Sequence, residues 1–190
     1  YCIICKKTGA LLFIMKKVLL IAVLAIVAIG ASAQTGIRVW YGANISGNDG
    51  EGAKNKFNAL NIGVDYTKPF GDTAFDWAAG LSYQTKGFKV ADEKWNPGFL
   101  QVEANGSWNF VKDDEIKVGL FTGPYVGFLV NKDDADDAKT VDFGWQGGIM
   151  GEYNKISLKV GYEYGFLDVA KDAPTSCKPY QIFFRVGYTF

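Results

Sequence analysis

Four aspartates within five residues form the segment of this sequence that is best suited to bind a metal ion. They are Asp133, Asp134, Asp136 and Asp137. Carboxylate oxygens are the ligands that Ca²⁺ and Mg²⁺ prefer, but the segment lacks the glycine and the terminal glutamate of an EF-hand loop. A solvated loop tip is therefore favoured, with surface contact to a divalent cation as the alternative.

Histidine is absent from the sequence, and its absence removes most of the familiar catalytic sites. Ser-His-Asp hydrolysis, Cys-His chemistry and most zinc sites all need an imidazole. Cys177 lies in a polar segment where only Lys178 would lower the pKa of its thiol, so a bystander is favoured over a reactive or lipidated cysteine. We expect no catalytic residue, no cofactor and no enzymatic activity.

A second set of ionisable residues alternates with apolar residues through the rest of the chain. It comprises Arg38, Asp65, Asp76, Glu103, Lys117, Glu152, Lys159, Glu163 and Arg185. The positive and negative charges of this set come close to balance. If they share a narrow interior, they either line an ion path or form a plug of salt bridges. The plug is favoured, because an unpaired buried charge is costly.

Period-two alternation identifies the elements that carry these charges. Eight segments alternate apolar with polar or small residues, the pattern of a β-strand with two different faces. They are residues 37–45, 60–66, 75–83, 100–110, 116–128, 141–153, 156–166 and 180–190. Most of them reach about 9–11 residues, the length that a tilted strand needs to cross a bilayer.

The connections between these segments are long and short in turn. The long, polar ones are residues 46–56, 87–98, 131–140 and 168–179, and the short ones are residues 68–73, 112–114 and 154–155. An up-and-down barrel of the outer membrane has long loops outside the cell and short periplasmic turns. The sequence therefore predicts an all-β fold, an eight-stranded antiparallel up-and-down transmembrane β-barrel with extracellular long loops.

The two faces of the predicted strands indicate which one meets lipid. The apolar rows contain many aromatic residues and belong outside, against lipid and headgroups. The last row, from Tyr180 to Phe190, must pair with the first strand, because a transmembrane sheet can leave no edge. Glycines recur on the polar face, where we expect them to make room for large lumen side chains.

The N-terminal residues predict export. Residues 15–33 contain two lysines, twelve apolar residues and an Ala-x-Ala site, which is the pattern of a signal peptide. Residues 1–14 precede a start methionine, and we interpret them as a spurious extension of the reading frame. Residues 34–190 form the predicted barrel domain, with 16 basic and 20 acidic residues. This mildly acidic balance argues against a nucleic-acid partner.

Three segments and the C-terminus carry a family resemblance. The segments are Leu120-Phe-Thr-Gly-Pro-Tyr-Val-Gly-Phe-Leu129, Asp142-Phe-Gly-Trp-Gln-Gly-Gly-Ile-Met-Gly151 and Leu158-Lys-Val-Gly-Tyr-Glu-Tyr-Gly-Phe-Leu167. Together with the terminal Val186-Gly-Tyr-Thr-Phe190, they resemble the PorT-like (porin family) outer-membrane β-barrel proteins of Bacteroidota. The resemblance implies a Gram-negative outer membrane, and a last strand ending in Phe190 that the outer-membrane assembly machinery reads.

The family resemblance implies a place and a fold more than an activity, since most members have no assigned one. We expect a structural or surface-interaction role, in contact with outer-membrane lipid and lipopolysaccharide. Contact of the four aspartates with the cations that bridge lipopolysaccharide is the alternative to a solvated loop tip. A small porin-like channel is one alternative. An accessory role in protein secretion or envelope assembly is the other, because one branch of the family is associated with secretion and gliding.

Overall fold

The structure is a computed structural model that describes residues 36–50, 53–90, 93–113, 115–132, 139–168 and 177–190. These residues form ten β-strands, eight of which build a barrel. The barrel strands are β1 (Ile37–Asn48), β2 (Ala53–Pro69), β3 (Phe75–Thr85), β6 (Gly98–Lys112), β7 (Ile116–Asn131), β8 (Val141–Tyr153), β9 (Ile156–Gly165) and β10 (Pro179–Thr189). The other two are β4 (Phe88–Val90) and β5 (Glu93–Trp95).

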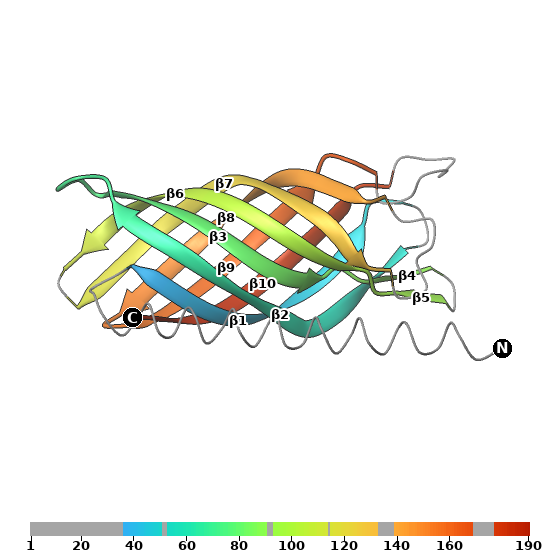
Figure 1. Ribbon diagram of the computed structural model, residues 1–190, viewed down its shortest axis with the longest axis horizontal. Coiled ribbons are helices and arrows are strands. Elements are labelled where there is room, and N and C mark those ends of the chain that lie inside the picture. Colours follow the sequence, from blue (N-terminus) through green and yellow to red (C-terminus); the bar gives the residue numbers. More distant parts are fainter. Residues whose placement is uncertain (1–35, 51–52, 91–92, 114, 133–138, 169–176) are drawn as a thin grey trace, which may run out of the picture. The chain divides into compact units, whose positions relative to one another are not determined.

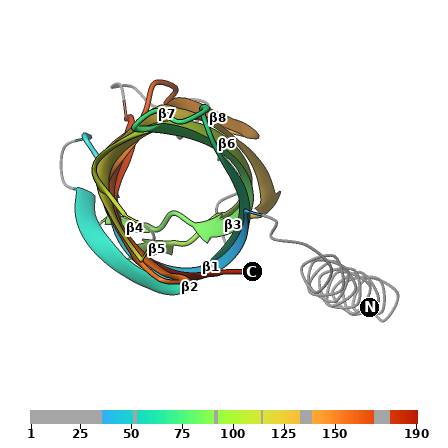
Figure 2. The same cartoon turned by 90° about the vertical axis from the view of Figure 1, so that its left-hand side faces the viewer.

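The barrel is closed by the pairing of its first and last strands. Every barrel strand is antiparallel to both of its neighbours, and β1 pairs with β2 on one side and with β10 on the other. The register of the closing pair places Ile45 opposite Ile182 and Val39 opposite Tyr188. Figure 2 shows the strands as a closed ring. The predicted eight-stranded antiparallel barrel, closed by its C-terminal strand, is confirmed.

Side chains alternate strictly between the lumen and the outer surface. In β6, Gln101 is 0% exposed and Glu103 is 2% exposed, whereas Val102 and Trp108 are about half exposed. The last strand behaves in the same way, with Phe183 and Arg185 buried and Ile182 and Phe184 exposed. The assignment of the polar face to the interior and of the apolar rows to the exterior is therefore correct.

Exposed aromatic side chains gather near both ends of the barrel. Near the short turns, Tyr66 packs edge-to-face on Trp77, and Trp108 packs on Phe110. Near the opposite end, Tyr162 stacks on Tyr180, and Phe166 contacts both Phe143 and Tyr164. Two such belts of aromatic residues are typical of barrels whose ends lie at membrane interfaces.

At the end of the barrel that carries the long connections, the strands extend further than predicted. The predicted loop 46–56 is wrong for most of its length, because β1 continues to Asn48 and β2 begins at Ala53. A register shift between Gly42 and Asn44 lets this pairing continue, with Ser46 opposite Lys56. The ends of these two strands extend beyond the apolar part of the outer surface, so they need no apolar face. Their composition is therefore polar, and in the sequence it resembles that of a loop.

The predicted loop 87–98 also contains strands. The short strand β4 pairs with the start of β2 and with β5, and Figure 1 shows β4 and β5 at the end of the barrel opposite the short turns. Viewed along the barrel in Figure 2, the β4–β5 hairpin crosses the ring of strands. The short turn at residues 154–155 is as predicted, with Asn154 in the left-handed region (φ 54°).

Several expectations lie outside the described residues. These are the extension 1–14, the signal peptide 15–33 and the four aspartates Asp133, Asp134, Asp136 and Asp137. Within the part of the chain that the structure describes, no helix is long and apolar enough to cross a membrane.

Candidate functional site in the barrel lumen

The lumen is filled by charged and polar side chains that bind one another. The structure divides the nine ionisable residues of the predicted network among separate groups along the lumen. Each takes part in an ion pair, and seven of them belong to the buried residues of the barrel. Since water has little access to these seven residues, their partners within the lumen decide what the site can do.

The most deeply buried pair joins β10 to β6. Arg185 donates from Nη1 to both carboxylate oxygens of Glu103, at 2.9 and 3.0 Å. Its guanidinium carbon lies 4.2 Å from the ring centroid of Trp40 and 4.1 Å from that of Phe183. The planar cation is thus held between two aromatic faces, an arrangement that favours arginine over lysine.

A second group of charges surrounds Asp65 on β2. Its carboxylate accepts hydrogen bonds from Lys159 Nζ at 2.9 Å and from Trp40 Nε1 at 2.7 Å. Arg38 lies 3.6 Å from the same carboxylate and donates to Glu152 Oε2 at 2.6 Å. Four strands, β1, β2, β8 and β9, are therefore joined across the lumen by ionic hydrogen bonds.

A third group lies near the end that carries the β4–β5 hairpin. Lys86 follows β3 and reaches across the lumen to Asp142 Oδ2 on β8 at 2.7 Å and to Glu163 Oε1 on β9 at 2.5 Å. The Tyr125 hydroxyl donates to Asp142 Oδ2 at 3.2 Å. Glu163 also accepts hydrogen bonds from the amides of Gln101 and Gln181, each at 2.8 Å.

The charges at the short-turn end are more exposed. Lys112 lies 3.3 Å from Asp76, which also accepts a hydrogen bond from Asn109 at 2.8 Å. Lys117 lies 3.7 Å from Glu152, and its side chain is 31% exposed. These pairs stand where the lumen opens to solvent, so each contributes less than a buried pair.

Three participants were missed when the charge network was predicted from sequence. They are Lys86, Lys112 and Asp142. The alternation placed Lys86 and Asp142 on the polar face, but the predicted charge network did not include them, and Lys112 was placed in a turn. The signal that finds them is the phase of the alternation, because Lys86 is two residues after Gln84 and Asp142 is two residues before Gly144.

Lumen glycines make room for the large side chains. A Cβ on Gly63 would lie 2.4 Å from Cζ2 of Trp40, and one on Gly187 would lie 2.8 Å from Cδ of Arg38. Atoms cannot approach this closely without a shift of backbone or ring. The predicted space-making role of these glycines agrees with the packing.

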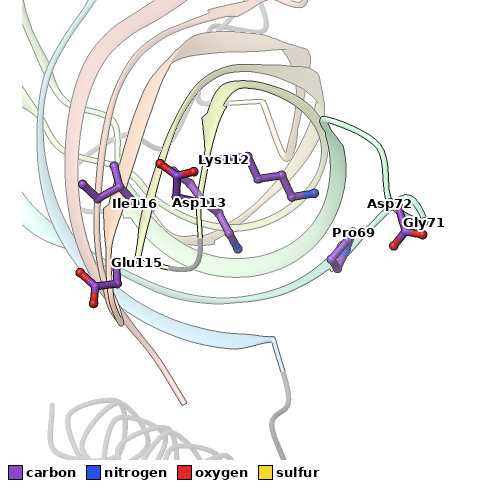
Figure 3. A pocket seen from close by; sticks show the side chains of 8 residues that line it. Pro69, Gly71, Asp72, Lys112, Asp113, Glu115 and Ile116 are labelled. Atoms are coloured by element: carbon purple, nitrogen blue, oxygen red, sulfur yellow. The ribbon is translucent and has the colours of Figure 1, made fainter.

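An open cavity of about 950 Å³ lies at the short-turn end of the barrel. Its lining combines Lys112 and Lys117 with the carboxylates of Asp72, Asp113 and Glu115. Figure 3 shows Asp72 on one side of this mouth and Glu115 on the other, so the carboxylates do not converge on one point. The cavity is a vestibule in which no single ligand position is marked.

The described part of the chain offers little support for a metal site or a reactive thiol. Its residues contain no group of three or more potential metal ligands. Cys177 is a free cysteine, and burial together with the carboxylates of Asp49 and Asp168 raises the pKa of its thiol. A raised pKa lowers the thiolate fraction at neutral pH, which agrees with the interpretation of Cys177 as a bystander.

Several solved structures are similar to this barrel, among them that of an outer membrane enzyme. The outer membrane enzyme PagL matches with a TM-score of 0.51 and 13% sequence identity, over 80% of this chain and 99% of that chain. Neisserial surface protein A has a TM-score of 0.49 at 13% identity, over 82% of this chain and 97% of its own. The attachment invasion locus protein Ail of Yersinia pestis has a TM-score of 0.44 at 13% identity, over the same shares, 82% and 97%.

At this level of identity the comparison concerns the fold alone. No protein-family model matches the sequence, and no curated protein sequence matches it. The likeness to PagL, which spans almost all of that enzyme, establishes an eight-stranded β-barrel of the outer-membrane type.

Proposed function

We propose that this protein is an integral outer-membrane β-barrel with a structural or surface-interaction role, and that its lumen is closed to ions. One observation carries the proposal, namely that the charges of the lumen are paired with one another and that most of them are buried. The ion pairs of the lumen join six cationic side chains to six anionic ones. An ion would have to break several of these pairs to pass, and each broken buried pair costs about 3–5 kcal/mol.

The outer surface supports the membrane location. Exposed Leu, Ile, Val or aromatic side chains occur on all eight barrel strands, whereas soluble monomers rarely expose large apolar patches. The signal-peptide pattern at residues 15–33 supports export, and the short turns are proposed to face the periplasm. Membership of the PorT-like proteins remains part of this proposal and rests on the resemblance of the glycine- and aromatic-rich strands.

The ionisable groups of the lumen support a non-enzymatic role. A catalytic acid or base must reach a substrate, but Glu103, Asp65 and Glu163 are each no more than 2% exposed. Their oxygens accept hydrogen bonds from Arg185, Lys159 and the lumen amides. PagL is an enzyme on the same fold, and the proposal here is that this chain uses the fold without catalysis.

Planar-bilayer recording tests the closed lumen. We expect the purified, refolded protein to give no conductance steps above the lipid background at moderate voltage, because no water-filled path crosses the charge network. A conducting porin inserted under the same conditions is the control for the assay. Regular unitary steps that scale with protein concentration would contradict the proposal and favour the channel.

Cys177 offers a test of the proposed orientation. It precedes β10 on the side of the long connections, so we expect a membrane-impermeant maleimide to label it on intact cells. Because the pKa of its thiol is raised, we expect labelling to be slow at pH 7. The labelling rate should continue to rise up to a higher pH than the rate for cysteine in solution. The measurement is labelling rate against pH.

The matched control for orientation places the cysteine at the other end of the barrel. In a Cys177→Ser, Asp72→Cys variant the thiol lies in the turn between β2 and β3. We expect this variant to be labelled only after the outer membrane is permeabilised. The opposite labelling pattern of the two proteins would show that the barrel is inserted the other way.

A further inference from the structure

We propose that Asp142, Glu163, Tyr125 and Phe99 form a binding site for a primary alkylammonium group, and that Lys86 occupies this site as an internal ligand. The site has the parts that ammonium recognition needs, two carboxylates and two aromatic faces. Occupation by Lys86 also holds the β4–β5 hairpin at the lumen. This proposal goes beyond the structural role proposed above and depends on the lumen geometry alone.

The position of the Lys86 ammonium defines the site. Its Nζ is 2.7 Å from Asp142 Oδ2 and 2.5 Å from Glu163 Oε1. The same atom lies 4.2 Å from the ring centroid of Tyr125 and 5.6 Å from that of Phe99. All five residues are 5% exposed or less, so the ammonium interacts with the carboxylates and rings with little screening by water.

The anionic groups of the site exceed the single positive charge that they hold. Two carboxylates face one ammonium, and Asp142 Oδ1 is buried without a hydrogen-bond partner among the described residues. Without a cation, Asp142 and Glu163 would be two like charges in a buried position, which is strongly unfavourable. The vacated site is therefore expected to take up either a proton or another cation in place of Lys86, and an ammonium ion must compete with the proton.

The attachment of Lys86 links the site to the hairpin. The Lys86 amide donates to Pro97 O at 3.0 Å at the base of the β4–β5 segment, and Ser46 Oγ donates to Gly87 O at 2.6 Å. Phe88, the first residue of β4, is 5% exposed. Lys86 stands between β3 and β4, and its ammonium joins this segment to β8 and β9, which are not neighbours of β3 in the barrel.

The shape of the occupant selects the class of ligand. Lys86 reaches the carboxylates through an unbranched alkyl chain, and its Nζ lies over the rings of Phe99 and Tyr125. Its Nζ donates to both carboxylates, and a quaternary ammonium has no N–H to donate. The site is therefore specific for a slim aliphatic primary amine, such as an alkylamine or the side chain of a lysine in a partner peptide.

Chemical rescue of Lys86→Ala tests the site. Alanine keeps Cβ, and n-propylammonium has three carbons and one nitrogen, which correspond to the Cγ, Cδ, Cε and Nζ atoms that the substitution removes. We expect the variant to have a lower thermal midpoint, measured by the heat-dependent mobility shift, and n-propylammonium to restore it saturably with an apparent Kd on the order of 1 mM. Tetramethylammonium at equal ionic strength should restore nothing, and the unsubstituted protein should respond to neither salt.

Two variants serve as controls. The first is the triple variant Lys86→Ala, Asp142→Asn, Glu163→Gln, in which neutral amides replace both carboxylates. We expect this variant to show no response to n-propylammonium. Lys117→Ala removes a lysine from the open short-turn mouth and should show no response either. Equal effects of the two salts, or a response that survives in the triple variant, would overturn the proposal.

Refolding yield replaces the thermal midpoint if Lys86→Ala refolds poorly. The yield into lipid vesicles should then rise with n-propylammonium and not with tetramethylammonium, and equal yields in the two salts would count against the site. Failure here is distinct from failure of the proposed function, because the conductance of the unsubstituted protein is measured without any amine.

Discussion

Replacing Arg185 with alanine is expected to lower the free energy of unfolding of the barrel by about 3–5 kcal/mol. The substitution leaves the Glu103 carboxylate, which is 2% exposed, without the two hydrogen bonds at 2.9 and 3.0 Å that Arg185 supplies. It also removes the cation between Trp40 and Phe183. Urea unfolding in lipid vesicles, followed by tryptophan fluorescence, measures the difference.

A double variant distinguishes the effect of an unpaired Glu103 carboxylate from the effect of lost side-chain packing. In Arg185→Met, Glu103→Leu both charges are replaced by apolar side chains of similar size, so no unpaired charge stays in the lumen. Because replacement of a whole buried pair is often neutral or stabilising, we expect most of the lost stability to return. If Arg185→Ala costs less than about 1 kcal/mol, the value of a surface salt bridge, the lumen is hydrated and the closed-lumen proposal is wrong.

Replacing Ile149 with arginine is the second change with a large expected effect. Ile149 is 58% exposed on the outer face of β8, near the middle of the strand. On the lipid face of a transmembrane barrel, an arginine at the midplane costs about 2–4 kcal/mol. A surface substitution in a soluble protein usually changes stability by no more than about 0.5 kcal/mol, so the result distinguishes the two environments.

The matched control lies on the same face of the same strand. Tyr153 is also 58% exposed but stands at the end of β8, where the barrel meets the interface. We expect Tyr153→Arg to cost only about 0–1 kcal/mol in the same vesicles. Equal costs at the two positions would contradict the placement of the bilayer around the middle of the barrel.

The two substitutions act on opposite faces of one wall. The inner face resembles the interior of a protein with a polar core, since Gln101, Gln146 and Gln181 are buried as completely as Phe183. The outer face carries the apolar residues that a soluble barrel would bury. This inversion means that the lumen groups need one another as hydrogen-bond partners, whereas the outer face contributes stability by its transfer to lipid.

Most of the fold was predictable from the sequence because the side chains of a strand alternate with period two. The face on which a residue lies follows from its own segment. The outward position of Val102 and the inward position of Gln101 could therefore be predicted without knowledge of the other strands. The errors fell where the alternation loses its contrast. Around Ser46 and Lys56 both faces are polar, and the continued pairing of β1 and β2 could not be recognised.

The sequence by itself determined the eight strands, the closure of the last strand on the first and the presence of charges in the lumen. Only the tertiary structure decided which charges meet. Glu103 and Arg185 are 82 residues apart, and Lys86 meets Asp142 across 56 residues. Alternation is local, whereas contacts across the lumen depend on the tilt and stagger of all eight strands, which no single segment specifies.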